Sequence, residues 1–312
     1  MRLLTASIFI ALAIVSAFGQ DPAQTSAQSQ KQAASPEVNL ELTQTANAYR
    51  AGDFAAAQRH AERAVELDPA NLTAATFLAR VRHQRYQPGN DTEENLDRAR
   101  AAIAAYQKLL ALDSQSEEAY KAIAVLYAAT HQDQLLRAWI LQRATNAQLS
   151  NEKRALAYAI LAGKDWDCSY RITELPDNKF AEKKGGIGVV VFRRPKDAGQ
   201  LETMRQCIAT GLEMADAALL LDGNSESAWA YKTNLLLESA KLAEMEGMDL
   251  LKADREREAK AAGEQAAKLA AERRKKEEQG QPEPNGLELL PRPLPPPPTP
   301  KKPINHSEDP NR

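Results

Sequence analysis

Residues 51–71, AGDFAAAQRHAERAVELDPAN, decide how the rest of the chain is interpreted. A Gly-Asp turn precedes an Ala-rich stretch, and an Asp-Pro pair ends it because Pro cannot continue a helix and restricts the residue before it. Ala57, Ala61 and Ala64 recur at helical spacing and therefore lie on one face. A face of Ala lets another helix approach closely. The stretch predicts the second helix of a helical hairpin, and a hairpin of this kind is expected to repeat along the chain.

The landmarks of this hairpin resemble those of the tetratricopeptide repeat (TPR), a helix–turn–helix unit of about 34 residues. The residues that carry the resemblance are Gly52-Asp53-Phe54, Ala57, Ala61, Ala64 and Pro69. A second unit begins at Leu72. A third begins at Glu117 and departs from the pattern in its second helix, where Arg143 takes the place of a small residue. A fourth unit is split, and Gly211, Ala215 and Ala218 mark its second helix.

The resemblance implies an all-α, right-handed solenoid of four to five hairpins over residues 37–248, with an insertion at 163–200. Inside the insertion, residues 168–175 (CSYRITEL) alternate, and residues 187–194 (IGVVVFRR) are β-branched and apolar. We expect these two segments to pair as a small β-hairpin, joined through a Pro-Asp-Asn segment and ending at Gly-Gly.

The ends of the chain differ from the solenoid in composition. Residues 1–19 have the layout of a secretory signal peptide, and the alternative is an uncleaved anchor. Residues 20–36 predict a flexible leader, and 280–312 a Pro-rich disordered tail that serves either as a partner's ligand or as a stiff spacer. Residues 249–279 predict a charged helix, exposed to water or forming a weak coiled coil. After signal cleavage we expect an exported protein without a membrane span, in the periplasm or outside the cell.

Export changes the interpretation of the two cysteines. Cys168 and Cys207 form an even pair in a compartment that permits disulfides, and they allow one connectivity. We expect a bridge that ties the inserted hairpin to the following helix. The alternative is two separate buried thiols.

Motifs for catalysis are absent from the sequence. The four His residues are scattered, without metal-ligand spacing, and there is no Walker or GxSxG motif. A net charge of −2 argues against nucleic-acid binding through bulk charge. We therefore expect no enzyme, no metal and no cofactor.

In TPR proteins the first helix of each hairpin lines a concave groove that binds partners. The resemblance carries this role onto Asn39, Tyr49, Arg50, Arg80, His83, Lys121, Asn234 and Glu238. Four of these residues, Arg50, Arg80, His83 and Lys121, predict a basic groove for an acidic or extended peptide. The alternative is that they are ordinary solvated side chains.

The sequence thus predicts a non-catalytic protein-interaction scaffold or assembly adaptor of the cell envelope. It binds an unidentified protein or peptide, either as an extended segment or as a helix. Two alternatives stay open. One is a structural envelope protein attached through its charged helix and Pro-rich tail, and the other is an accessory subunit of an envelope enzyme.

Overall fold

The computed structural model describes residues 35–280, which form ten α-helices and one β-hairpin. The predicted signal peptide, most of the leader and the Pro-rich tail lie outside these residues. The helices are α1 (Pro36–Arg50), α2 (Phe54–Leu67), α3 (Leu72–Gln84), α4 (Glu93–Leu112), α5 (Glu117–Ala129), α6 (Asp133–Thr145), α7 (Asn151–Thr173), α8 (Ala198–Leu221), α9 (Glu226–Met245) and α10 (Asp249–Glu278). The strands are β1 (Lys179–Lys184) and β2 (Ile187–Phe192).

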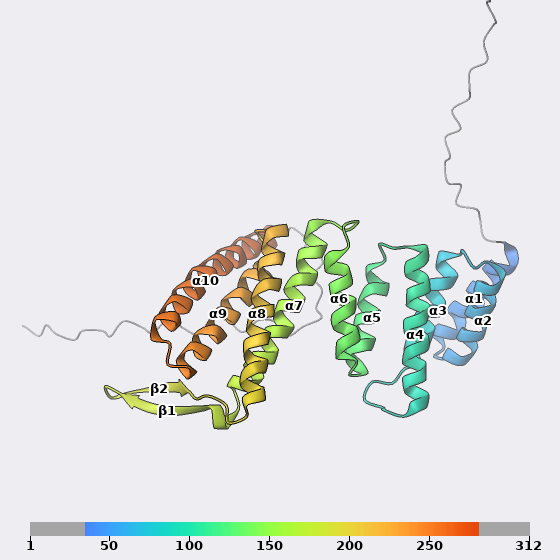
Figure 1. Cartoon of the computed structure of the whole chain (residues 1–312). Helices are drawn as coiled ribbons and strands as arrows, with labels where there is room; N and C mark the ends of the chain where they lie inside the picture. Colours follow the sequence, from blue (N-terminus) through green and yellow to red (C-terminus); the bar gives the residue numbers. More distant parts are fainter. Residues whose placement is uncertain (1–34, 281–312) are drawn as a thin grey trace, which may run out of the picture.

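Successive helices pair as five antiparallel hairpins that stack along the length of the molecule (Figure 1). Each helix packs against its neighbours in chain order, and the buried clusters overlap from one hairpin to the next. The hydrophobic core is thus a continuous strip along the stack of helices and not one central cluster. This confirms the predicted all-α stack of helical hairpins with a small β-hairpin.

The first hairpin has the local structure that its sequence predicts. Gly52 takes a positive φ of 77°, and Asp53 caps α2 by accepting a hydrogen bond from the amide of Ala56 at 2.8 Å. The three Ala residues on one face of α2 are fully buried, and α2 packs against both α1 and α3. Small side chains at this contact let the helices lie close together.

The loop between α3 and α4, residues 85–92, is held by the side chain of Asn95. That side chain is 1% exposed. Its Nδ2 donates to the carbonyls of Gln87 and Asn90 at 2.8 and 2.7 Å, and its Oδ1 accepts from the amide of Gln87 at 2.9 Å. A single amide thereby satisfies three backbone groups of the loop.

The expected position of the first strand is wrong. Residues 168–175 do not form a strand, because α7 continues to Thr173. Trp166, Ser169 and Thr173 are spaced as on one helix face, and all three are buried. The hairpin instead pairs β1 with β2 through a turn at Gly185 and Gly186, whose φ values of 60° and 84° suit a two-residue hairpin turn.

The Pro-Asp-Asn segment is likewise not the hairpin turn. Residues Pro176–Asn178 form a short 3₁₀-helix between α7 and β1. Proline at the start of such a turn has a suitable φ and lacks an N–H that would be left unpaired. This segment therefore turns the chain from the helix into the strand.

The disulfide between Cys168 and Cys207 is present, with an S–S distance of 2.04 Å and a Cα–Cα distance of 6.2 Å. Because Cys168 lies on α7 and Cys207 on α8, the bond joins the two helices of one hairpin. The expectation that it ties a strand to a helix is wrong for the same reason as the strand assignment.

Helix α10 does not stand free in water, which is one of the two alternatives expected for residues 249–279. It packs along α9 as the second helix of the fifth hairpin (Figure 1). Ala259 and Ala262 are buried against Leu236 of α9. Small and apolar residues on one face of α10 form this contact, together with ion pairs from Lys252 to Glu244 and from Arg273 to Glu226 of α9. Most of the other charged residues of α10 are exposed.

Candidate protein-binding surface

Side chains from the first helices of three successive hairpins meet on one surface, which we call the α1–α3–α5 surface. Its members are Tyr49 at the end of α1, Arg80 and His83 on α3, and Glu118 and Lys121 on α5. Tyr49 and Glu118 both act electrostatically on Arg80, which places the three side chains close together. The packed helices therefore bring together residues from three separate repeats.

Arg80 and Glu118 form the central contact of this surface. The guanidinium donates two hydrogen bonds to the carboxylate, from Nε to Oε1 at 2.6 Å and from Nη2 to Oε2 at 2.5 Å. The two side chains are 49% and 40% exposed. An exposed pair contributes only about 0–1 kcal/mol to stability, so a competing carboxylate can replace Glu118 at small cost.

Sequence reasoning missed Glu118. It stands at one of the repeat offsets that line the groove in TPR proteins, so the counting that selected Arg80 would also have selected it. Its pairing with a residue on another helix is a tertiary feature without a local sequence signal.

His83 lies at the inner border of the surface. Its Nδ1 is 3.2 Å from the hydroxyl oxygen of Tyr106, and the two rings meet edge to face with centroids 5.7 Å apart. Burial lowers the pKa of His83, although nearby Glu118 acts in the opposite direction. His83 is therefore neutral at pH 7. Burial likewise raises the pKa of Tyr106, which stays protonated and can donate a hydrogen bond.

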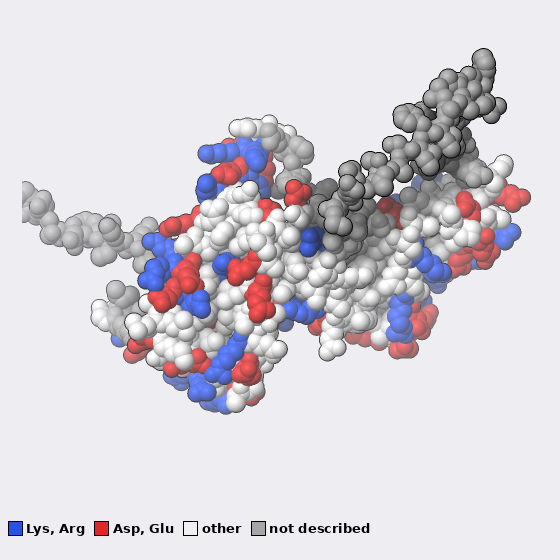
Figure 2. All heavy atoms as spheres, turned by 45° about the horizontal axis from the view of Figure 1, so that its top comes forward, with Lys and Arg blue, Asp and Glu red and all other residues white. Residues whose placement is uncertain are grey.

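The α1–α3–α5 surface is less basic than the sequence predicts. Glu118 balances the charge of Arg80, and His83 is neutral. Arg50 donates to the side-chain oxygen of Asn47, a neutral partner, at 2.9 Å. One turn beyond Lys121, Val125 is 43% exposed and adds an apolar contact. On the face of the molecule that Figure 2 draws, charges of both signs are interspersed.

Three predicted groove residues do not belong to this surface. Asn39 is exposed on the first turn of α1, far along the helix from Tyr49. Asn234 and Glu238 are buried, at 7% and 1% exposed, so the expectation that they line an open groove is wrong. The cause is direct packing of α7 on α9, which the repeat pattern does not include.

The buried carboxylate of Glu238 on α9 links this helix to α7 through hydrogen bonds. Its Oε2 accepts hydrogen bonds from the hydroxyls of Ser169 and Thr173, each at 3.0 Å. Its Oε1 accepts from the ammonium of Lys241 at 2.6 Å. All three contacts compensate for burying a charge, which is costly when a charge lacks partners.

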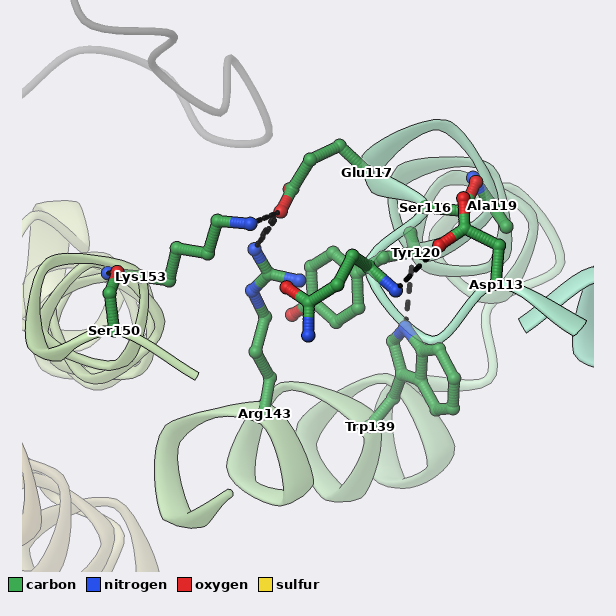
Figure 3. A network of polar contacts seen from close by, with 10 residues as sticks. Asp113, Ser116, Glu117, Ala119, Tyr120, Trp139, Arg143, Ser150 and Lys153 are labelled. Carbon is green, nitrogen blue, oxygen red and sulfur yellow. Dashed lines mark hydrogen bonds and ion pairs between the residues drawn. The ribbon is translucent and has the colours of Figure 1, made fainter. Parts of the chain in front are cut away.

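A second polar network joins α5, α6 and α7 (Figure 3). Arg143 is 7% exposed and lies 4.1 Å above the ring of Tyr120, which stacks on Trp139. The guanidinium donates to both carboxylate oxygens of Glu117 at 2.7 and 2.8 Å, and the ammonium of Lys153 lies 2.8 Å from Oε1. The large Arg143 thus replaces the small residue of the repeat with a charged and aromatic stack.

The charge of Glu117 is stabilised within this network. Burial alone would raise its pKa, but the hydrogen bonds from Arg143 and Lys153 outweigh burial and hold the pKa below its usual range. The hydroxyl of Tyr120 and the Nε of Arg143 have no hydrogen-bond partner within residues 35–280. Because both atoms are fully covered, the network acts as a joint between helices and not as a binding site.

The described part of the chain has neither a cluster of metal-ligating side chains nor a helix suited to cross a membrane. Across residues 35–280 no group of three or more His, Cys, Asp and Glu side chains is placed to hold a metal ion. In the same residues no helix combines the length and the apolar character needed to cross a membrane.

No protein-family model and no curated protein matches the chain. Among solved structures, the crystal structure of the MamA protein is similar, with a TM-score of 0.37 and 14% identity over 80% of this chain and 98% of that one. The structure of pilF of Pseudomonas aeruginosa is similar with a TM-score of 0.30 and 14% identity, and the match covers 76% of this chain and 97% of that one. The crystal structure of the P58(IPK) TPR domain is similar with a TM-score of 0.30 and 14% identity, and the match covers 76% of this chain and 66% of that one. Similarities at this level assign neither a family nor a function to this chain.

Proposed function

We propose that this chain is a non-catalytic interaction scaffold that binds an acidic extended peptide, or a helix bearing carboxylates, on the α1–α3–α5 surface. The observation that carries the proposal is the exposed Arg80–Glu118 pair, formed between two successive repeats. A partner carboxylate can take the place of Glu118 on Arg80 and keep both hydrogen bonds. Lys121 and Val125 supply a further charge and an apolar contact beside it.

The proposed place of action is the periplasm or the extracellular space. The Cys168–Cys207 bond supports this, because disulfides persist in oxidising compartments and are rare in the cytosol. The signal-peptide pattern of residues 1–19 is the second support, drawn from the sequence alone.

The test compares residues 20–312 of the chain with an Arg80→Ala, Lys121→Ala double variant. Each protein is immobilised and exposed to an envelope extract, and any captured protein is then titrated directly against both forms. We expect the double variant to bind about tenfold more weakly, because each exposed charge contributes on the order of 0.2–1 kcal/mol and the partner loses its two-bond contact. The matched control is Arg63→Ala, which removes a still more exposed ion pair from α2 and should leave binding unchanged.

The outcomes separate the candidate functions. Equal binding by the wild type and the double variant would refute the α1–α3–α5 surface as the site. No capture by either form would favour a structural envelope protein.

A further inference from the structure

The β-hairpin has open backbone groups on both sides. It is a sheet of only two strands that projects from one end of the helical stack (Figure 1). Hydrogen-bonded and non-bonded residue pairs alternate from the two-residue turn, where Lys184 pairs with Ile187. This alternation directs the amides of Ala181 and Lys183 outward from β1 and those of Gly188 and Val190 outward from β2.

The two edges have different surroundings. The β2 edge faces α9, and there the amide of Phe192 donates to Glu244 Oε1 at 3.4 Å, which agrees with the alternation. The β1 edge lies on the far side of β2 from the helices (Figure 1), and Ala181 and Lys183 are exposed. Within the described part of the chain, the outward amides of these two residues have no hydrogen-bond partner.

A hollow of about 580 Å³ lies beside β1. The residues that line it are Glu174, Pro176, Lys179, Phe180, Ala181, Val190 and Phe192. Most of this lining is apolar, and Val190 is 58% exposed at its border. An extended chain laid along β1 would have alternate side chains on the hollow's side of the sheet.

The charge of the hairpin indicates which kind of strand can bind at the β1 edge. Residues 179–196 contain six Lys or Arg and one Glu, a net charge of +5 in a chain whose total is −2. Lys179 and Lys196 pair with Glu174 and Asp177 outside this segment, whereas Lys183 and Arg194 are exposed. Two copies of such an edge would repel one another, and lysines on an edge strand generally prevent self-pairing. An acidic strand is the complementary partner.

We propose that the β1 edge binds an extended, acidic segment of a partner protein as a third strand. The partner's backbone pairs with the outward amides and carbonyls of Ala181 and Lys183. Its carboxylates lie on the face of the sheet that carries Lys183 and the hollow, and its apolar side chains alternate with them on the opposite face, which carries Phe180. This site is separate from the α1–α3–α5 surface, which lies at the other end of the stack (Figure 1). Either site can therefore fail its test without affecting the other.

The probe is an end-blocked, fluorescent EVEVEVE peptide, titrated into the full chain and followed by anisotropy. A KVKVKVK peptide of the same β-propensity should bind at least tenfold more weakly. The decisive pair of variants is Ala181→Pro and Gly188→Pro. Each removes an outward amide from one edge without removing a bond between β1 and β2, because Pro is tolerated where the N–H faces solvent. Ala181→Pro should weaken binding more than tenfold, and Gly188→Pro, which lies outside the lining of the hollow, should change it less than twofold.

A second measurement guards against a hairpin that fails to fold in the variants. A version of EVEVEVE that is N-methylated at alternate residues lacks the donors for β1, and it should lose binding to the unaltered chain. Equal binding by the Ala181→Pro variant and the wild type would overturn the proposal. So would equal binding of KVKVKVK, or binding to anionic vesicles that is unaffected by Ala181→Pro while EVEVEVE fails to bind.

Discussion

Gly211 on α8 shows how single residues set the spacing of the stack. A Cβ at this position would lie 2.6 Å from Leu235 Cδ2 and 3.0 Å from Asp165 Cβ, closer than side chains normally pack. The residue therefore allows α8 to lie close to both α7 and α9. The same holds for Gly163, where a Cβ would meet the ring of Tyr231 at 2.6 Å.

Gly211→Ala should destabilise the protein by about 1–3 kcal/mol, because overpacking outweighs the gain of about 0.5–1 kcal/mol that Ala normally gives in a helix. The matched control is Gly263→Ala on α10, where the nearest atom to an added Cβ is 3.4 Å away. That variant should be neutral or slightly stabilising. Urea unfolding of the three proteins measures the difference, and a more stable Gly211→Ala variant would contradict the proposed close contact.

The Glu117 network predicts a pH dependence. The folded pKa of Glu117 is lower than its ordinary value of about 4.5, so the folded protein holds the proton less tightly than the unfolded chain. Its stabilising contribution is thus fully present above pH 4.5 and is lost as the pH falls through the lowered folded pKa. The wild type should therefore lose its stability advantage over Glu117→Gln in this acid window.

Urea midpoints of both proteins between pH 7 and pH 3 provide the test. Glu66→Gln serves as the control, because the Arg63–Glu66 pair is exposed on both sides and should contribute under about 1 kcal/mol. A wild-type advantage that grows toward low pH would have the wrong sign.

At the scale of elements, α10 illustrates how few apolar residues can fix a helix in place. It carries charges along most of its length, and its buried residues are Ala259, Ala262 and Leu269. The first two pack against Leu236 of α9. The small residues allow the helix backbones to approach, so the buried area is gained without large side chains. The fifth hairpin is therefore part of the folded stack.

Ala262→Glu should destabilise the protein by about 3 kcal/mol, because a carboxylate would be buried against Leu236 without a partner. Its neighbour Ala261 is exposed on the same helix, and Ala261→Glu should change stability by less than about 0.5 kcal/mol. The two variants have the same composition and helix propensity, so thermal unfolding isolates burial. Equal effects would mean that α10 does not pack on α9 in solution.

The sequence predicts elements well where the repeat landmarks are strong. The turn, cap and Ala face at residues 51–71 are formed as expected, because each of them depends on neighbours within a few residues. Residues 168–175 alternate like a strand, but the first six of them form the end of α7, where Ser169 and Thr173 are buried against Glu238. Contacts over this distance in sequence leave no local pattern.

The candidate site was predictable to a similar extent. Repeat offsets pointed to Arg80 and His83, and the structure brings them together with Tyr49 on one surface. The offsets could not indicate that Glu118 balances Arg80 or that burial makes His83 neutral, because both depend on neighbouring repeats. For Asn234 and Glu238 the same counting failed, since α7 covers them.

At the scale of the whole molecule, contacts between neighbours dominate, so stability is expected to vary along the stack. The disulfide closes a segment with a sequence separation of 39 residues in the fourth hairpin. On the chain-entropy estimate such a bond contributes about 4 kcal/mol. Much of that gain should be concentrated where α7 and α8 pack.

A Cys168→Ser, Cys207→Ser variant should therefore lose about 4 kcal/mol of stability in the hairpin formed by α7 and α8. Hydrogen exchange in moderate urea is the measurement. Amides of α7 and α8 should lose protection in the variant, while those of α1 and α2 should change little. A uniform loss over all helices would indicate that the stack unfolds as one cooperative unit.

The side chain of Asn95 also has a consequence for proteolysis. Proteases cleave backbone that can be drawn into an extended conformation, and exposed loops with Pro and Gly are usually the first segments cut. Residues 85–92 have this composition, yet three hydrogen bonds of the Asn95 side chain, two donated and one accepted, hold their backbone in place. The loop between α3 and α4 is thus protected against proteolytic cleavage by the side-chain amide of Asn95, in the first turn of α4.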